Sequence, residues 1–235
     1  MADVCVVTGA GSGIGRATCL ALAKRGVSII MGGRNTERLE STAEECKGVN
    51  VRCSAGDVGN PDYTDSLFQY ALELREKSSK LLAVFAAGVA HFGPTLEQEH
   101  SLWEQTLRTN LTGIYNACRS AIRAMLPIGG GRIVNVLSTA SKIPFPESAA
   151  YVASKYGALG LTRSLNAEFR KKGILLTAFL PGSSATNLWE AQPWSPPRED
   201  MLDPRDVGEM IAYIVTSPPT YNVDEIVFMP PKGVL

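Results

Sequence analysis

The stretch Val4-Cys5-Val6-Val7-Thr8-Gly9-Ala10-Gly11-Ser12-Gly13-Ile14-Gly15 opens the chain with an apolar run that leads directly into a glycine-rich turn. A short, uninterrupted apolar run is typical of a strand that is buried on both faces of a parallel sheet. Glycine permits positive φ angles and lets a ligand approach the backbone closely. Residues 13–25 are predicted to form a helix, whose N-terminus offers free N–H groups and a positive dipole end to phosphates. The order of these elements predicts a nucleotide-binding turn.

The glycines of this turn, Gly9, Gly13 and Gly15, have the spacing GxxxGxG rather than the GxGxxG of many dinucleotide-binding folds. A glycine pattern alone is weak evidence, and a turn that binds nothing is the alternative, but the position after a first strand favours nucleotide binding. The Gly-Lys-Ser/Thr ending of nucleoside-triphosphate loops does not occur here. The predicted contacts to a dinucleotide come from Gly9, Ser12, Gly13, Ile14 and Gly15.

Apolar runs and amphipathic stretches alternate along the rest of the chain, which predicts a Rossmann-like α/β fold. We expect one domain over residues 1–235, with a doubly wound parallel sheet of about seven strands and helices on both faces. Residues 182–203, which contain several prolines and two tryptophans, are predicted to form a mobile substrate loop or lid. The further predicted strands are 27–31, 49–53, 81–85, 132–137, 174–180 and 225–229, and the further predicted helices are 35–47, one from 60, 97–126 with a break near Thr109-Asn110, 148–171 and 203–216.

The composition excludes several classes of function. With 45% hydrophobic residues, the 235-residue chain can bury one sizeable core. Lys plus Arg and Asp plus Glu both number 23, and this balance disfavours a nucleic-acid or membrane-surface partner. The sequence shows no basic stretch before an N-terminal apolar run, and no apolar stretch approaches the roughly 18 residues of a membrane span. We therefore expect neither a signal peptide nor a membrane anchor.

Cysteine and histidine usage points to reduced thiols and no metal centre. The five cysteines form no CxxC pair, and their scatter is typical of a cytoplasmic protein rather than of a disulfide scaffold. The two histidines, His91 and His100, offer little for a zinc site. With no GxSxG motif in the chain, they also offer little for a Ser-His-Asp hydrolase.

The end of the second predicted strand, Gly32-Gly33-Arg34, bears on the choice of cofactor. In many dinucleotide-binding folds, an acidic residue about 20 residues beyond the glycines holds the ribose 2′-hydroxyl. Glycine and arginine stand at that place here, and the forked, charged guanidinium favours a phosphate. A solvated arginine at a helix start is the alternative. The sequence therefore predicts NADP(H) in preference to NAD(H), with Arg34 on the 2′-phosphate.

Tyr151 and Lys155 are four residues apart, so on a helix they share a face. A tyrosine has an ordinary pKa of about 10, and a neighbouring ammonium favours the phenolate and lowers that value. Ser138 follows the fifth predicted strand, where its hydroxyl can hold a substrate oxygen. Taken alone, a tyrosine and a lysine at this spacing can also be a surface pair without a catalytic role, with the long lysine side chain lying beside the ring. Together with the glycine turn, the three residues predict proton transfer to or from a carbonyl group.

The chain resembles the short-chain dehydrogenase/reductase family over nearly its whole length. The turn Thr8–Gly15 matches the family's TGxxxGxG pattern. The catalytic tetrad of the family matches Asn110, Ser138, Tyr151 and Lys155 in order and spacing. The remaining cofactor contacts implied by this resemblance are Asp57 and Val58 at the adenine, Ala87 and Gly88 at the adenosine ribose, and Pro181, Gly182, Ser184 and Thr186 at the nicotinamide, which Tyr151 and Lys155 also approach.

The resemblance implies a role for each member of the tetrad. Tyr151 would be the general acid in reduction and the general base in oxidation. Lys155 would lower the pKa of the tyrosine and hold the nicotinamide ribose. Ser138 would orient the carbonyl group, and Asn110 would support a water relay to Lys155.

The chain departs from the family after its fourth predicted strand, where Asn-Asn-Ala-Gly is replaced by Phe85-Ala86-Ala87-Gly88. The side-chain hydrogen bonds of the two asparagines are lost, and we expect a cost in stability or affinity rather than lost chemistry.

The family also implies a homodimer or homotetramer, with contacts through the helices at 105–126 and 148–171. We expect five aromatic residues around a substrate pocket, namely His91, Phe92, Phe145, Trp189 and Trp194. The alternative is that these side chains only pack in the core of the protein.

Two functions remain after these observations. The first is an NADP(H)-dependent oxidoreductase that moves a hydride between the nicotinamide and a ketone, a secondary alcohol or a 3-oxoacyl thioester. The second is an NADP(H)-binding sensor or scaffold that keeps the fold without turnover. The complete tetrad favours the enzyme, and the two missing asparagines keep the second alternative open.

Overall fold

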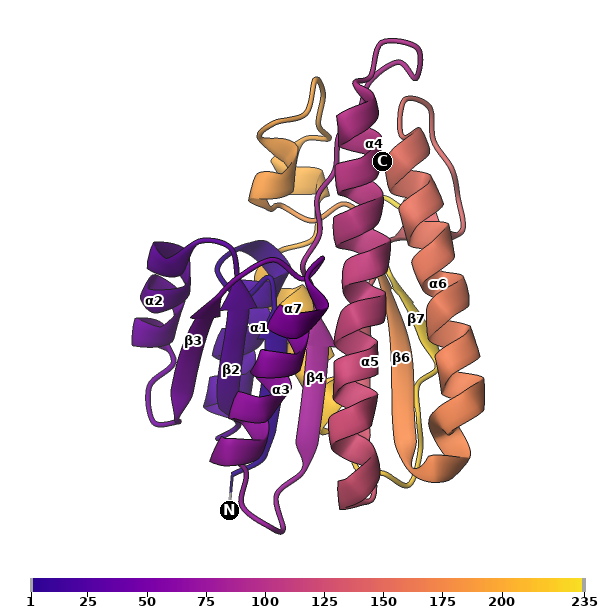
Figure 1. The fold of residues 1–235 in the computed structure, drawn as a ribbon. Coiled ribbons are helices and arrows are strands. Elements are labelled where there is room, and N and C mark those ends of the chain that lie inside the picture. The colour runs from indigo at the N-terminus through magenta and orange to yellow at the C-terminus, as the bar shows by residue number, and fades with distance from the viewer. Residues whose placement is uncertain (1, 234–235) are drawn as a thin grey trace.

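The computed structural model describes residues 2–233 and shows a seven-stranded, all-parallel sheet with the strand order β3-β2-β1-β4-β5-β6-β7. Helices cover both faces of this sheet, so the predicted Rossmann-like, doubly wound α/β domain is confirmed (Figure 1). Each strand lies within two residues of its predicted bounds at either end. The strands are β1 (Val4–Thr8), β2 (Ser28–Gly33), β3 (Val51–Ala55), β4 (Leu81–Phe85), β5 (Gly131–Val136), β6 (Ile174–Pro181) and β7 (Glu225–Phe228).

Two hydrophobic cores lie on the two faces of the sheet, because successive side chains of a strand point to opposite sides. In β1, Val4 and Val6 belong to the core under α3, α5 and α6, whereas Cys5 and Val7 belong to the core under α1, α2 and α7. The helices are α1 (Gly13–Lys24), α2 (Thr36–Glu45), α3 (Pro61–Leu74), α4 (His100–Leu107), α5 (Gly113–Met125), α6 (Ala149–Phe169) and α7 (Pro204–Thr216).

Local sequence signals set several helix starts. The side chains of Asn35, Asn60 and Asp203 each accept a hydrogen bond from a backbone N–H of the first turn of α2, α3 and α7. Such caps satisfy donors that a helix start leaves unpaired. Proline follows the cap at the start of α3 and α7, where its missing N–H costs nothing.

The long helical region differs from its prediction at Asn110. The chain does not break there: α4 continues through a π-helical turn, Arg108–Thr112, directly into α5. Figure 1 shows these segments as one continuous column beside α6. A π turn inserts an extra residue into the helical ladder, and such turns occur frequently at functional sites.

The sheet reverses its winding between β1 and β4, which are neighbours in space but not in sequence. Ligands of open α/β sheets bind beyond the carboxyl ends of the strands at such a switch point. The glycine turn follows β1, and Ala87-Gly88 follows β4, so both lie at this point. Among the described residues, no helix has both the length and the apolar character that crossing a membrane requires.

Candidate active site

The glycine turn between β1 and α1 is packed too closely for side chains at two of its positions. A Cβ atom on Gly15 would lie 2.2 Å from the carbonyl oxygen of Gly9, and one on Gly9 would lie 2.8 Å from the backbone of Ala86 and Ala87. Gly9 and Gly13 also have positive φ angles of 70° and 49°. The hydroxyl of Thr8 accepts a hydrogen bond from the N–H of Ala87. The first and fourth strands are thereby joined at the switch point.

The start of α1 is suited to bind an anion. Ser12 occupies the N-cap position but gives the helix no side-chain cap, so the first-turn N–H groups and the positive dipole end are not used by a capping side chain. This is the arrangement that binds the pyrophosphate of a dinucleotide in a strand–turn–helix unit. Gly13, Ile14 and Gly15 form the first turn. The chain therefore fits a dinucleotide phosphate at the position that the sequence predicts.

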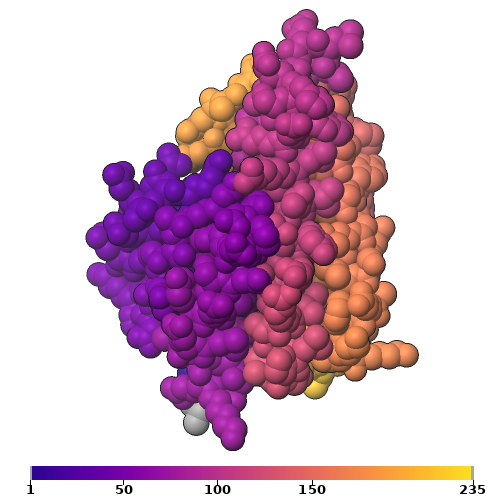
Figure 2. Space-filling view, in the orientation of Figure 1, coloured from indigo at the N-terminus to yellow at the C-terminus, as the bar shows by residue number. Residues whose placement is uncertain are grey.

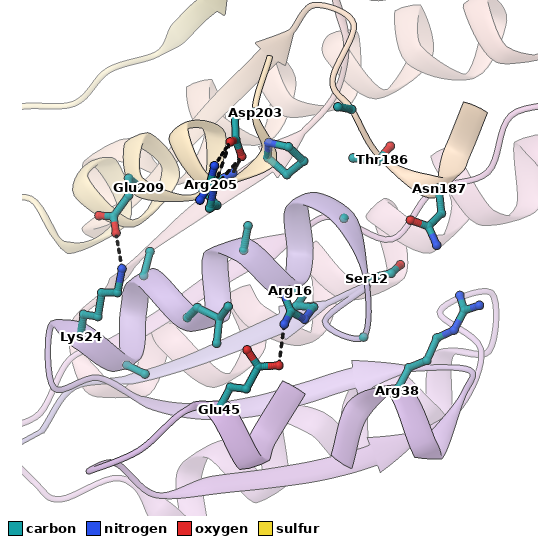
Figure 3. A pocket seen from close by; sticks show the side chains of 18 of the residues that line it. Ser12, Arg16, Lys24, Arg38, Glu45, Thr186, Asn187, Asp203, Arg205 and Glu209 are labelled. Carbon is teal, nitrogen blue, oxygen red and sulfur yellow. Dashed lines mark hydrogen bonds and ion pairs between the residues drawn. The ribbon is translucent and has the colours of Figure 1, made fainter. Parts of the chain in front are cut away.

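A groove of about 940 Å³ runs from the glycine turn along α1, between α2 and α7. Figure 3 shows Arg16 paired with Glu45, and Lys24 paired with Glu209, along this groove. The Arg38 side chain lies at the end near Ser12, and the figure draws no interaction from it. Because Ser138, Tyr151 and Lys155 do not line the groove, it extends from the phosphate turn and not from the reacting centre.

Three of the residues predicted to contact the adenosine part of the cofactor, Arg34, Asp57 and Val58, lie at the carboxyl ends of β2 and β3. Arg34 is exposed immediately after β2. Asp57 and Val58 follow β3, where the Asp57 carboxylate accepts a hydrogen bond from the N–H of Gly59 and pairs with Arg108. The carbonyl of Val58 accepts a hydrogen bond from the Asn116 side chain. These contacts fix the loop after β3 against the α4–α5 column.

Asn110 is fully buried in the π turn and holds the loop that follows β4. Its Oδ1 accepts from the N–H of Val89 at 2.9 Å, and its Nδ2 donates to the carbonyl of Val89 at 2.8 Å. Nδ2 also donates to Oγ of Ser154, on α6. A Cβ atom on Gly88 would lie 3.4 Å from Asn110 Oδ1 and 3.9 Å from Lys155 Nζ. Three members of the predicted site, Gly88, Asn110 and Lys155, are therefore neighbours.

Lys155 is buried on α6, and its ammonium donates to the carbonyl of Val136 at the end of β5. Its Nζ lies 5.5 Å from the centre of the Tyr151 ring. Burial disfavours the charged form and lowers the pKa of Lys155 to about 8. The lysine thus lies beside the tyrosine, as the four-residue spacing predicts.

The pKa of Tyr151 is raised by burial, and a hydrogen bond with the Ser138 side chain opposes this rise. The direction differs from the sequence prediction, which counted the Lys155 ammonium and left out the burial of both groups. The Ser138 hydroxyl also accepts from the N–H of Ala140 in the turn after β5. Ser138 and Tyr151 therefore meet, although thirteen residues separate them in the sequence. The phenol keeps its proton in this environment, as a general acid requires.

The segment after β6 returns to the glycine turn. Pro181 is the last residue of β6, and the hydroxyl of Ser184 donates to the carbonyl of Gly182. A Cβ atom on Gly13 would lie 3.1 Å from the methyl group of Thr186. The predicted nicotinamide segment and the predicted phosphate turn are therefore in contact, although more than 170 residues separate Gly13 from Thr186.

Four of the five aromatic residues predicted to line a substrate pocket gather over Tyr151. The ring of Phe92 lies within 5.8 Å, centre to centre, of Phe145, Tyr151, Trp189 and Trp194. His91 differs: its carbonyl accepts from the Gln98 side chain, and among the described residues its Nε2 atom is buried without a hydrogen-bond partner. We call Phe92, Phe145, Trp189 and Trp194 the aromatic box.

Two residues of this region, Gln192 and Arg38, are not predicted from the sequence. Gln192 bonds to the backbone of Ala90, Phe92 and Leu188, but a single glutamine in a proline-rich loop carries no recognisable pattern. Arg38 lies against the glycine turn, since a Cβ atom on Gly11 would lie 3.0 Å from the Arg38 Cβ. Its position on the first turn of the helix that Asn35 caps, close in sequence to Arg34, was the available signal.

Comparisons with known proteins place this geometry in a family. The sequence pattern of the short chain dehydrogenases matches residues 3–195, so the chain belongs to the short-chain dehydrogenase/reductase family and is an oxidoreductase of that family. A relative named 3beta-hydroxysteroid dehydrogenase, from Mediterraneibacter gnavus, is 40% identical over 194 residues, which are 80% of this chain and 68% of the relative.

Solved structures agree with this assignment. The actinorhodin polyketide ketoreductase, solved as its F189W variant with NADPH, is 29% identical and superposes with a TM-score of 0.85 over 97% of this chain and 95% of its own. A metagenomic short-chain oxidoreductase in complex with NADP is 27% identical, with a TM-score of 0.82 over 97% of both chains. The family binds a nicotinamide cofactor, and both of these neighbours were solved with the phosphorylated form.

Proposed function

We propose that this protein is an NADP(H)-dependent carbonyl reductase that interconverts a ketone and a secondary alcohol. The observation that carries the proposal is the group formed by Ser138 and the buried Tyr151 and Lys155, beside a glycine turn that fits a dinucleotide. The bound nicotinamide supplies or accepts the hydride at the substrate carbon. A 3-oxoacyl thioester remains within the chemistry of this site.

In the direction of reduction, Tyr151 gives its phenolic proton to the carbonyl oxygen. Ser138 donates a hydrogen bond to the same oxygen and holds it within reach of the phenol. The Lys155 ammonium, 5.5 Å from the ring, stabilises the phenolate that remains. Asn110 keeps the Val89 loop in place beside Lys155. Proton transfer of this kind contributes about 10² to 10⁴ in rate.

The preference for NADP(H) is supported by charge at the mouth of the phosphate turn. Both Arg34 and Arg38 are exposed there: Arg34 is the first residue after β2, and Arg38 lies on the first turn of α2. Arg16, by contrast, is paired with Glu45. Gly32 and Gly33 place no carboxylate at the end of β2, where one would repel a 2′-phosphate. Two guanidinium groups therefore remain for that phosphate.

The assembly and the compartment are part of the same proposal. We expect a homodimer or homotetramer through α5 and α6, which carry the exposed rings of Tyr115 and Tyr156. We also expect a cytoplasmic location, in keeping with five cysteines that are all free thiols.

The test compares the wild type with Tyr151→Phe by following NADPH consumption over a panel of ketones, aldehydes, quinones and 3-oxoacyl thioesters. The wild type is expected to turn over at least one class, whereas Tyr151→Phe loses turnover and still binds NADPH in a calorimetric titration. Retained turnover in Tyr151→Phe would contradict the mechanism. Binding of NADPH by a wild type that consumes none with any carbonyl compound would favour the non-catalytic alternative.

A further inference from the structure

We propose that the substrate is a flat, apolar, ring-bearing ketone or secondary alcohol, whose fused rings are held by the aromatic box; this inference rests on the reductase function proposed above. It selects one class from the carbonyl compounds that Tyr151 could reduce. The contacts among the rings, the loop that carries two of them and the charges around them favour this class of substrate.

Phe92 is the centre of the box. It meets Phe145 and Tyr151 edge to face, at 5.3 Å and 5.6 Å between ring centres, and it stacks on Trp194 at 5.8 Å with an interplanar angle of 19°. Trp189 lies 5.7 Å from both Phe92 and Trp194. A carbonyl group that reaches the Tyr151 hydroxyl therefore brings the rest of its molecule against these rings. A flat apolar body can meet these rings with the stacked and edge-to-face contacts that they make with one another.

The substrate loop is closed at its base. Ser184 and Leu202 form a parallel bridge, in which the N–H of Ala185 donates to the carbonyl of Leu202 and the N–H of Leu202 donates to the carbonyl of Ser183. The indole N–H of Trp189 donates to the carbonyl of Ser184. The ring of Trp189 is thereby oriented by the same segment that is predicted to contact the nicotinamide. The backbone of the loop therefore holds the Trp189 ring in place on one side of the box.

Gln192 fastens the tip of the loop to the opposite wall. Its Oε1 accepts from the N–H of Phe92 at 3.0 Å, and its Nε2 donates to the carbonyls of Ala90 and Leu188, both at 2.9 Å. Figure 2 shows the light-orange loop lying against the magenta part of the chain that follows β4. These bonds tie the loop that carries Trp189 and Trp194 to the segment that carries Phe92, which makes Gln192 a positioning residue for the box.

The charges near the box disfavour an anionic substrate. The three segments that carry the rings are 88–93, 143–152 and 186–197, and their charged side chains are Glu147 and Glu190. Both are acidic and exposed. The phosphates of a coenzyme A thioester would meet two carboxylates and no cation within these segments. A straight acyl chain would also lose rotational freedom on binding, a cost that a rigid ring system avoids. The box therefore favours a rigid ring system over the 3-oxoacyl thioester.

The test measures kcat/KM with NADPH for a decalone, a straight-chain decanone with the same number of carbons, and acetoacetyl-coenzyme A. The wild type is expected to prefer the decalone to each of the other two by at least about tenfold. Trp194→Leu should remove most of that preference. Trp103→Leu is the matched control, because Trp194 and Trp103 are 39% and 37% exposed, and Trp103 lies on α4 outside the box.

Gln192→Glu gives a second readout that a general loss of folding would not produce. The variant keeps the shape of the side chain but loses the two donors to Ala90 and Leu188. A wider or looser box should raise KM for the decalone about tenfold, with kcat within about threefold of the wild type. An unchanged KM would overturn the assignment of Gln192.

Binding separates this inference from the proposed reaction. Decalone is titrated calorimetrically into Tyr151→Phe, which keeps the ring of the tyrosine, in the presence of oxidised cofactor. Binding that Trp194→Leu weakens and Trp103→Leu does not would support the box even if no carbonyl compound were turned over. The inference is overturned if decalone does not bind, if the decanone or the thioester is preferred, or if the two tryptophan variants behave alike.

Discussion

The side-chain amide of Asn110 bonds to both backbone groups of Val89, and in this way a helix side chain pairs with the loop after β4 as a neighbouring strand would. Val89 adjoins Gly88, which lies against Lys155. The π turn and Lys155, the predicted catalytic lysine, are therefore linked through the loop on which the adenosine ribose is predicted to lie. Asn110 holds the architecture of the site even before any role in a proton relay is considered.

Replacing Asn110 by alanine should leave the half-buried N–H and carbonyl of Val89 without their side-chain partner. We expect the free energy of unfolding to fall by about 2–4 kcal/mol, measured by urea denaturation. Asn116→Ala is the matched control, because Asn116 is also buried in this column but bonds through its side chain to the carbonyl of Val58. It should cost about 1 kcal/mol. If both variants lost the same free energy of unfolding, the two bonds to Val89 would stabilise the fold no more than the single bond of Asn116 does.

A methyl group at Gly15 should damage the phosphate turn. Its Cβ would lie 2.2 Å from the carbonyl oxygen of Gly9, so the turn must shift. We expect Gly15→Ala to lower stability by about 1–3 kcal/mol and to weaken NADPH binding at least roughly tenfold. Gly160→Ala in α6 meets no heavy atom within 4 Å and should instead stabilise the fold, by about 0.5–1 kcal/mol. Unchanged NADPH affinity in Gly15→Ala would place the cofactor elsewhere.

Stability should depend on pH through Lys155. Burial lowers the pKa of Lys155 in the folded protein to about 8, whereas the unfolded chain keeps the ordinary value near 10.5. Between these values the unfolded state binds the extra proton, so the contribution of Lys155 to stability rises with pH, by at most about 3 kcal/mol. The measurement is the difference in unfolding free energy between the wild type and Lys155→Met at several pH values.

The variant is subtracted because other groups also make stability depend on pH. Burial raises the pKa values of several thiols, such as those of Cys46 and Cys118, so their contribution to stability falls as the pH rises, in the wild type and in the variant alike. Their contribution is the same on each side and cancels. A wild-type-minus-variant difference that stays flat from pH 7 to pH 11 would contradict a buried, depressed lysine.

The cofactor preference should depend on Arg34 and Arg38. Reversing either charge is expected to weaken NADPH binding by roughly tenfold to a hundredfold and to leave NADH binding nearly unchanged, because only NADPH carries the 2′-phosphate. The variants are Arg34→Asp and Arg38→Asp, and calorimetry with both cofactors is the measurement. Lys47→Asp makes the same charge change at an exposed position farther along the groove and serves as the control. Equal losses for NADPH and NADH would exclude a phosphate contact.

The sequence by itself determined the order of the elements and much of the site. Strands buried on both faces leave continuous apolar runs, caps such as Asn35 and Asn60 mark helix starts, and the strand–glycine–helix order at residues 4–15 has few structural solutions. The four-residue spacing of Tyr151 and Lys155 was sufficient to place both on one face of α6. Each of these signals is local, so neighbouring residues carry it.

The tertiary structure alone decided what depends on contacts between distant segments. Burial depends on the whole fold, and it raises the pKa of Tyr151 where the sequence predicted a lowered value. At the break predicted near Asn110 the helix forms a π turn, and the Asn110 side chain bonds to Val89 and Ser154. The hydrogen bond between the Phe92 N–H and the Gln192 side chain joins residues 100 positions apart. Non-local pairing of this kind leaves no periodic trace in a single sequence, and only the closed packing of the sheet and its loops brings the partners together.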